Sequence, residues 1–467
     1  MIRLVTACFI ALLATDTLAQ MRPGGPPEEA FTACSGVREG EECSFQAPHG
    51  EVTGTCRQMR EPDLLCVPRW APGSGPRPGN GRTTGGSRPL APGQSRPSQP
   101  RQNRSRPIRI ASRNPNARVT RSHIPDTGQG SCFDDSRSIP CPGPGAAFHG
   151  QDAQYLGAQR SYRDNGDGTL TDQVTGLTWQ QAHNPVRLGW QAASDACRSL
   201  TLGGRDDWRL PEIKELYSIA DFAGVTGQRP FLDPLFEIQE PGPEILDNDR
   251  FAATHRTDMM GQTWSATRYA GNHWDRPGVE AAFFFNFLDG RIKQAPTKGR
   301  SKLFYRCVAG ESWGDNTFVD NGDGTVTDRA AGLVWQQSDD GRTRNWQQAL
   351  DYCENLQLAG HDDWRLPNAK ELQSLVDYRY HAPALDREFF RQQDNNGWFW
   401  SSTTHGELPD QAIYLCFGKC VSVDGTDVHG AGAQRSDPKR GDPRRYGSGL
   451  GGQQDQVRIQ NYARCVR

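Results

Sequence analysis

Two short acidic loops have the residue types that could bind a metal ion. DNGDGTLTD covers residues 164–172, and DNGDGTVTD covers residues 320–328. Carboxylate oxygens are ligands that calcium prefers. The candidate calcium ligands are Asp164, Asp167, Asp172, Asp320, Asp323 and Asp328. The spacing does not fit an EF-hand loop, whose first ligand position would fall on Arg163 or Val319. A tight turn in which Gly, Asn and Asp adopt left-handed backbone explains the same residues, so calcium is the alternative to a structural turn.

The cysteines are a second set of residues that could do chemistry, and the chain has 13 of them. Residues 1–19 have the charge, apolar run and small-residue end of a cleavable secretory signal, which would remove Cys8; a lipoprotein anchor at Cys8 is the alternative. An even number of cysteines in an exported protein favours disulfides over metal–thiolate sites. No other apolar stretch approaches the ~20 residues of a membrane helix. We therefore expect a secreted, periplasmic or cell-surface protein without a transmembrane segment.

The acidic loops belong to a long internal repeat. Residues 164–216 and 320–372 are identical at 30 of 53 positions, at a constant offset of 156. Later features also pair, although their offset drifts. The repeat predicts two domains, at residues 160–310 and 316–467, and it places length differences such as 425–455 in loops.

Each copy has the pattern of an α+β domain, with two helices on a small, mostly antiparallel sheet. Apolar residues recur at helical spacing from Trp190 and again from Trp346, where Asn345 is the expected N-cap. A second helix follows the WRLP sequence of each copy. Alternating residues predict hairpins at 281–294 and 411–423.

The cysteines of the two copies predict one long-range disulfide in each. Cys197 and Cys307 occupy the same relative places as Cys353 and Cys465, so a helix cysteine would be tied to the last strand in both copies. Cys416 and Cys420 occur in the second copy alone, which predicts a further bridge; a reactive dithiol is the alternative.

Two groups of cysteines precede the repeats. A module at residues 31–68 has too few apolar side chains for a core, so we expect two bridges to hold it together, with three connectivities open. Its cysteines are Cys34, Cys43, Cys56 and Cys66. Cys132 and Cys141 enclose a short proline-containing loop directly before the first repeat.

A strongly basic linker joins the module to the rest of the chain. Residues 69–125 contain twelve arginines, many Gly, Pro and Ser residues, and no Asp or Glu, which predicts a disordered tether. Because the whole chain has a net charge of −2, the residues outside this basic linker are acidic on balance. Such a tether attracts polyanions; a simple spacer is the alternative. Apart from Trp70 at the start, no Phe, Trp or Tyr residues interleave the arginines, so we expect no specific nucleic-acid recognition.

The order DNGDGT, GL.WQ, DWRLP, WSST and RCV resembles the C-terminal domain family named for the Legionella collagen-like adhesin. The resemblance covers about residues 160–310 and 316–467. It implies two tandem C-type lectin-like domains, a fold in which a disulfide from the first helix to the final strand is usual. The chain lacks a Gly-X-Y tract, so the stalk of the namesake is not implied. The Glu-Pro-Asn or Gln-Pro-Asp signature of calcium-dependent sugar binding is absent.

Candidate ligand residues lie in the loops that differ between the copies. Exposed aromatic side chains could stack on sugar rings. The candidates are Tyr269, His273, Trp274 and Trp398; packing in the core is the alternative for each of them. The recurring Arg209 and Arg365, by contrast, are expected to form buried pairs with Glu215 and Glu371 beneath a tryptophan.

These patterns predict an exported binding protein that recognises a glycan or another polyanionic surface ligand. The alternative is a non-catalytic scaffold of the cell envelope. The sequence has no Ser-His-Asp set, zinc motif or phosphate loop, so we expect no enzyme activity and no cofactor apart from the calcium alternative. A formylglycine-generating-like oxidase using Cys416 and Cys420 is the catalytic alternative. No pattern indicates an oligomeric state.

Overall fold

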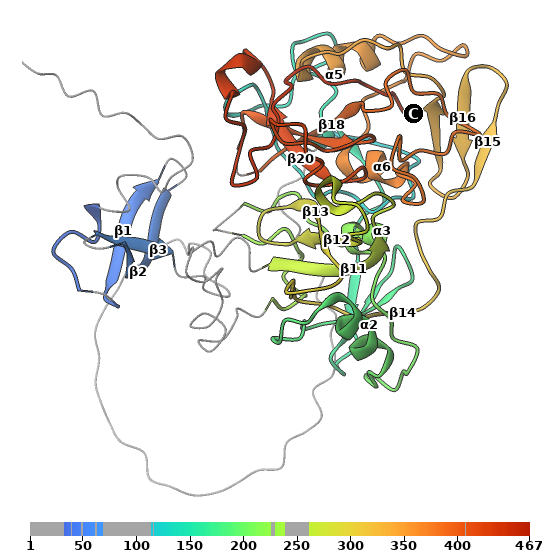
Figure 1. Ribbon diagram of the computed structural model, residues 1–467. Coiled ribbons are helices and arrows are strands. Elements are labelled where there is room, and N and C mark those ends of the chain that lie inside the picture. Colours follow the sequence, from blue (N-terminus) through green and yellow to red (C-terminus); the bar gives the residue numbers. More distant parts are fainter. Residues whose placement is uncertain are drawn as a thin grey trace, which may run out of the picture. The chain divides into compact units, whose positions relative to one another are not determined.

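The computed structural model divides the chain into two compact units, Met1–Arg69 and Trp70–Arg467 (Figure 1). It describes residues 32–38, 40–47, 50–60, 63–68, 114, 116–225, 229–238, 261–406 and 408–467. The predicted signal at 1–19 and residues 69–113 of the predicted linker lie outside the described residues. Within these ranges, no helix has both the length and the hydropathy of a membrane span.

The first unit is a three-stranded antiparallel sheet held by two disulfides. Its strands are β1 (Glu42–Ala47), β2 (Gly50–Arg60) and β3 (Asp63–Pro68), in the order β1-β2-β3. Cys34 is bonded to Cys56, and Cys43 to Cys66, which selects one of the three open connectivities. All four cysteines are buried and form the centre of this small core.

In the second unit, one six-stranded antiparallel sheet runs through both repeats, in the order β11-β12-β13-β20-β19-β18 (Figure 1). The first repeat supplies β11 (Gln262–Arg268), β12 (Ala281–Asn286) and β13 (Arg291–Pro296). The second supplies β18 (Trp398–Thr404), β19 (Gln411–Cys416) and β20 (Gln434–Pro438). The order is the same from either end, and β13 meets β20 where Ile292 pairs with Gln434. The repeats are thus related by an approximate two-fold axis at this seam.

Each repeat has its own small sheet beside the shared one. In the first, β8 (Tyr162–Asp164), β9 (Thr169–Asp172), β10 (Thr178–Gln180) and β14 (Val308–Ala309) pair in the order β14-β10-β9-β8. In the second, β15 (Phe318–Asp320), β16 (Thr325–Asp328) and β17 (Leu333–Gln336) pair in sequence. Short 3-10 turns are η4 (His273–Asp275) and η5 (Pro443–Tyr446).

Two helices in each repeat pack on the sheets. They are α2 (Trp190–Arg198) and α3 (Ile213–Ser218), and then α5 (Trp346–Glu354) and α6 (Ala369–Ser374). The predicted N-cap of α5 is confirmed, since the Asn345 side chain accepts from the Gln348 amide at 2.9 Å. The predicted helix-to-strand disulfides are also present, as Cys197–Cys307 and Cys353–Cys465.

The predicted Arg–Glu pairs are confirmed in both repeats. Arg209 donates to both carboxylate oxygens of Glu215 at 2.5 and 2.6 Å, and Arg365 to those of Glu371 at 2.6 and 2.7 Å. The pair of the second repeat is the more enclosed, since the Arg365 side chain is 3% exposed and that of Arg209 is 29% exposed.

This difference in exposure comes from residues 116–159, which we call the covering segment and which pack mainly on the second repeat. It contains β4 (Arg118–Val119), β5 (Cys132–Phe133), β6 (Ser138–Ile139), η1 (Asp152–Gln154) and β7 (Tyr155–Leu156). Tyr155 lies under the Arg365 guanidinium at 5.2 Å. A disulfide joins Cys132 to Cys141.

The covering segment corrects the predicted end of the linker at residue 125. β4 pairs in parallel with β7, and Ile124 is 6% exposed. Residues 116–125 are therefore folded, because isolated apolar residues such as Ile124 find a partner on the second repeat that the local composition does not reveal.

The hairpin predicted at 411–423 is also corrected. β19 pairs with β20 at 434–438, inside the insertion that the sequence placed in a loop. The Cys416–Cys420 disulfide closes a turn directly after β19, so the chain runs through residues 421–433 before it returns to the sheet.

A shared interior makes the two repeats one folding unit. One buried apolar cluster contains residues of both repeats, and Phe283 packs edge-on against Tyr378 with ring centroids 5.0 Å apart. A lysine of each repeat also forms a hydrogen bond with the other repeat. Lys214 donates to the Ser374 carbonyl and Lys370 to the Ser218 carbonyl, both at 2.7 Å. Each lysine thus binds the last turn of the other repeat's helix.

We expect the two repeats to unfold in a single transition. Phe283→Ala removes a ring that is fully buried at their interface, and such a change costs about 3–5 kcal/mol. The variant should lower one common midpoint, measured by tryptophan fluorescence, which excludes the module at 31–68 because it has no tryptophan. A variant that unfolds in two steps, with one repeat intact after the first, would contradict the shared interior.

Candidate functional site

A cleft of about 620 Å³ opens where the two repeats meet. Its walls come from the start of α3, the end of β11, the connection between the repeats and the chain after α6. The lining residues are Glu212, Ile213, Lys214, Ala266, Thr267, Arg268, Ser312, Trp313, Gly314, Asp315, Asn316, Phe318, Leu375, Val376, Asp377, Tyr378, Arg379 and Asp386. The cleft is large enough for a small ligand or a few residues of a polymer.

Lys214 lies in the cleft wall and is held by the protein on all sides. Its ammonium donates to the Gly314 carbonyl, the Asn316 side-chain oxygen and the Ser374 carbonyl, at 3.1, 2.9 and 2.7 Å. Burial lowers the pKa of Lys214 to about 8. An ammonium has three donors, and all three of those of Lys214 are used. Lys214 therefore stabilises the junction between the repeats and is poorly placed to act as a nucleophile.

Carboxylates and arginines give the cleft its polarity. Glu212 accepts from the Thr267 hydroxyl, and burial raises the pKa of Glu212. Burial would also raise the pKa of Asp377. Hydrogen bonds from Arg379 outweigh the effect of burial, so the pKa of Asp377 is lowered. Arg379 also lies 3.8 Å from Asp386. The arginine is therefore shared between two carboxylates, while Asp315 at the mouth is exposed.

Three half-buried aromatic side chains, Trp313, Phe318 and Tyr378, complete the lining. Aromatic faces beside fixed polar groups suit ligands that have both apolar and hydrogen-bonding surface. The cleft can thus bind and orient a ligand through aromatic, carboxylate and main-chain contacts.

The sequence did not identify this cleft. The one signal was Lys214, which recurs as Lys370 at the same place in the second copy. Trp313 and Asp315 lie in the connection between the repeats and belong to no recurring motif.

The predicted ligand residues Tyr269, His273, Trp274 and Trp398 lie elsewhere, and the expectation that they are exposed is wrong for three of them. Tyr269, His273 and Trp398 are 6%, 8% and 0% exposed. Trp398 stacks on Tyr414 with centroids 4.8 Å apart. Trp274 is half-buried and donates to the Val428 carbonyl at 3.2 Å. Tyr269 and Trp274 contact Asp427 and Val428 because loops of the two copies pack on each other, whereas Trp398 is covered within its own repeat.

The disulfide specific to the second copy supports that packing. Cys416 and Cys420 are bonded, as predicted, and both are buried. The Cys420 amide donates to Asp427 at 3.0 Å, and Asp427 accepts the hydroxyl of Tyr269 from the first repeat. The bridge therefore holds the loop that receives the other copy.

The acidic loops form tight turns. Asp164 accepts from the Gly166 amide at 2.8 Å and Asp167 from the Thr169 amide at 3.1 Å; Asp320 and Asp323 repeat these bonds in the second copy. The structure does not bring the three aspartates of either loop, which include the buried Asp172 and Asp328, together as one ligand group. Calcium binding itself stays a prediction.

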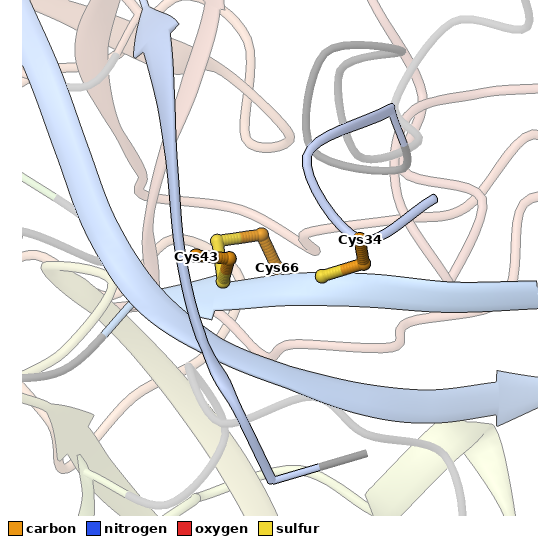
Figure 2. Close-up of side chains that lie close together, drawn as sticks. All are labelled: Cys34, Cys43 and Cys66. Carbon is orange, nitrogen blue, oxygen red and sulfur yellow. A yellow bond between two sulfur atoms is a disulfide. The ribbon is translucent and has the colours of Figure 1, made fainter. Parts of the chain in front are cut away.

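Among the described residues, one group of three potential metal ligands does lie together, at Cys34, Cys43 and Cys66 (Figure 2). Their sulfur atoms are within 4.8 Å of one another. Each sulfur already belongs to a disulfide, so no thiolate is present to bind a metal ion. The group is a pair of adjacent bridges.

Comparison with known proteins gives one match. The family model described as the Lcl C-terminal domain matches residues 168–309 and 324–435, together more than half of the chain. No curated protein matches, and no solved structure matches.

The buried Lys214 predicts a pH-dependent stability. Its pKa is about 8 in the folded protein and about 10.5 in an unfolded chain, so between these values the unfolded chain binds more protons. Lys214 should therefore contribute a rise in stability of about 3 kcal/mol as the pH increases from 8 to 10.5. Burial also lowers the pKa of Lys370 and Lys439, which remain in both variants. In urea titrations, the rise of Lys214→Met should therefore be smaller by about this amount than that of Lys302→Met, at an exposed position. An equal rise in both variants would contradict the prediction.

Proposed function

The chain belongs to the Lcl C-terminal domain family, and on this premise we propose that it is an exported, adhesin-like binding protein. We propose further that its ligand is a glycan or another polyanionic surface component. Family membership carries the adhesin-like part of this proposal. The six disulfides of the described residues support export, because disulfides persist in oxidising compartments.

Charge segregation supports the polyanionic ligand. Residues 69–113 contain ten arginines and no Asp or Glu, although the whole chain has a net charge of −2. A run of cations that lacks local anions attracts sulfated or acidic polymers through counterion release. Since no aromatic side chains interleave these arginines apart from Trp70 at the start, the attraction would not be specific for nucleic-acid bases.

The proposed fold of each repeat is C-type lectin-like. Two features support it: the disulfide from α2 or α5 to the end of the repeat, and the packing of two helices on antiparallel sheets. Sugar binding through calcium is not part of the proposal, because the sequence signature for it is absent.

Binding without catalysis is part of the same proposal. Cys416 and Cys420, the residues of the oxidase alternative, are joined in a disulfide, and Lys214 has no free donor. These observations support binding without catalysis at the cleft.

The linker arginines predict salt-sensitive binding to heparin or lipopolysaccharide. If six or more of them contact anionic groups, affinity should fall by about 10³-fold between 50 and 200 mM salt. Replacing the ten arginines of residues 69–113 by glutamine should abolish the salt-sensitive part, while scrambling the order of these residues should leave it unchanged. Binding can be measured on the full chain with a glycan and polyanion array.

Three other results of the array would each change the assignment of the ligand. Loss of binding on scrambling would indicate a specific motif instead of charge. Binding by the glutamine variant would assign the ligand to the repeats. No binding to any polyanion or glycan would contradict the proposal and favour the envelope scaffold.

A further inference from the structure

The approximate two-fold axis gives each repeat an equivalent position for the cleft, and in the second repeat this position is filled by the covering segment. Gln129 donates its side-chain amide to the Thr404 carbonyl at 2.7 Å and accepts from the Thr404 amide at 2.9 Å. The Thr403 hydroxyl donates to Asp152 at 2.6 Å. Lys370 donates to the Asp126 carbonyl at 3.1 Å. The chain's own polypeptide thus occupies this position.

The matching residues of the first repeat line the open cleft. Thr267 and Arg268 correspond to Thr403 and Thr404 in the aligned TWSAT and FWSST stretches, and Lys214 corresponds to Lys370. Thr267 donates to Glu212, whose carboxylate takes the place that Asp152 has in the second repeat. The first repeat therefore satisfies its buried hydroxyl without a covering segment and leaves the volume above it open.

The edge of β11 offers main-chain groups to this volume. The Tyr269 amide donates to the Ala281 carbonyl at 2.9 Å, and the preceding pair is Arg268 with Ala282. Hydrogen-bonded and non-hydrogen-bonded pairs alternate in an antiparallel ladder, so the Arg268 N–H and C=O point away from β12. Thr404 has the same position relative to Ala412, and its outward groups are the ones that bind Gln129.

A second edge runs along the opposite wall. At the filled position on the second repeat, residues 124–126 pair with Ala158 of the same covering segment. The Asp126 amide donates to the Ala158 carbonyl at 2.7 Å, and the Ala158 amide donates to the Ile124 carbonyl at 3.1 Å. The offset of 156 places Gly314 where Ala158 lies, and Gly314 lines the cleft. Residues 124–129 of the covering segment lie between the Thr404 edge and Ala158 at the end of the same segment. An extended chain in the cleft would lie between Arg268 and Gly314, whose carbonyl also accepts from Lys214.

We propose that the cleft of the first repeat is a docking site for an extended segment of a partner polypeptide. The segment would pair its main chain with residues 312–314 and place an Asn or Gln side chain against the outward main-chain groups of Arg268. The covering segment shows on the second repeat that such a position accepts extended polypeptide. A secondary amide such as an acetamido group presents its N–H and C=O on opposite sides and cannot reproduce the paired bonds made by Gln129.

Charge selects the kind of segment. Glu212, Asp315 and Asp377 line the cleft. Of the cations in the lining, Arg379 lies between two carboxylates, Arg268 lies 3.9 Å from Glu280, and Lys214 has no free donor. Exposed Asp315 therefore favours a segment with basic side chains. This docking goes beyond the proposed glycan or polyanion binding, and it does not depend on the linker arginines.

The test uses the full chain and a labelled synthetic peptide that copies residues 118–131, which contain Arg118, Arg121 and Gln129. Fluorescence anisotropy should show saturable binding. Ser312→Trp places a large ring in the cleft at an exposed position and should weaken binding at least tenfold. The control Ser138→Trp, at an exposed serine that does not line the cleft, should change the affinity less than twofold.

A second peptide tests the amide contact. The peptide with Gln129→Glu cannot donate to the Arg268 carbonyl and should bind at least tenfold more weakly. Equal affinities of the two serine variants, or no saturable binding to the unmodified chain, would overturn the proposal. A neutral oligosaccharide that binds in a Ser312→Trp-sensitive way while the peptide does not would assign the cleft to saccharide and also overturn it. Heparin binding through the linker should be the same in both serine variants, so failure here is distinct from failure of the proposed function.

Discussion

The mutual burial of the two repeats is the constraint on which the rest of the structure depends. Each repeat presents one face of its part of the sheet and one short helix, and neither has enough helix to cover that face alone. The pairing of β13 with β20 makes the two half-sheets one, and aromatic contacts such as Phe283 on Tyr378 fill the space beneath. Lys214 and Lys370 then bind carbonyls of the opposite helix ends, so the helices are positioned by each other's repeat.

Buried charged residues lie on both sides of the seam between the two half-sheets. Lys293 on β13 lies 3.3 Å from Asp289, and Arg435 on β20 donates to Asp455, which also accepts from His429 at 2.7 Å. Burial and the nearby Arg435 hold the pKa of His429 low, at about 4, although Asp455 acts against them. Buried ion pairs add little net stability, but separating one from its partner is expensive. Each of these pairs lies within a single repeat, so the buried charges on both sides of the seam are paired by residues of their own repeat.

The two repeats are equivalent in architecture, and three local features distinguish them. The covering segment encloses the Arg365–Glu371 pair and leaves Arg209 half-exposed. The Cys416–Cys420 bridge shapes a loop that only the second copy has. At the start of the second helix, the first repeat has Glu212 where the second has Asn368. Glu212 supplies the carboxylate that Asp152 of the covering segment supplies in the second repeat. The cleft is the result of this asymmetry.

The sequence by itself determined the features that are local or written twice. The disulfides of each repeat, the Arg–Glu pairs and the turns of the acidic loops occur in both copies, so one copy supports the other. The Asn345 cap follows from its place directly before the helical pattern that begins at Trp346. Only the tertiary structure decided that Tyr269 and Trp398 are buried, that β20 lies in an apparent insertion, and that residues 116–125 are folded. Tyr269 and residues 116–125 are buried by contact with segments more than a hundred residues away, and β20 is a strand supplied from a loop. Trp398 is covered by Tyr414 and Arg458 of its own repeat. Periodicity reports which face of an element is apolar, but it does not report which distant segment covers that face.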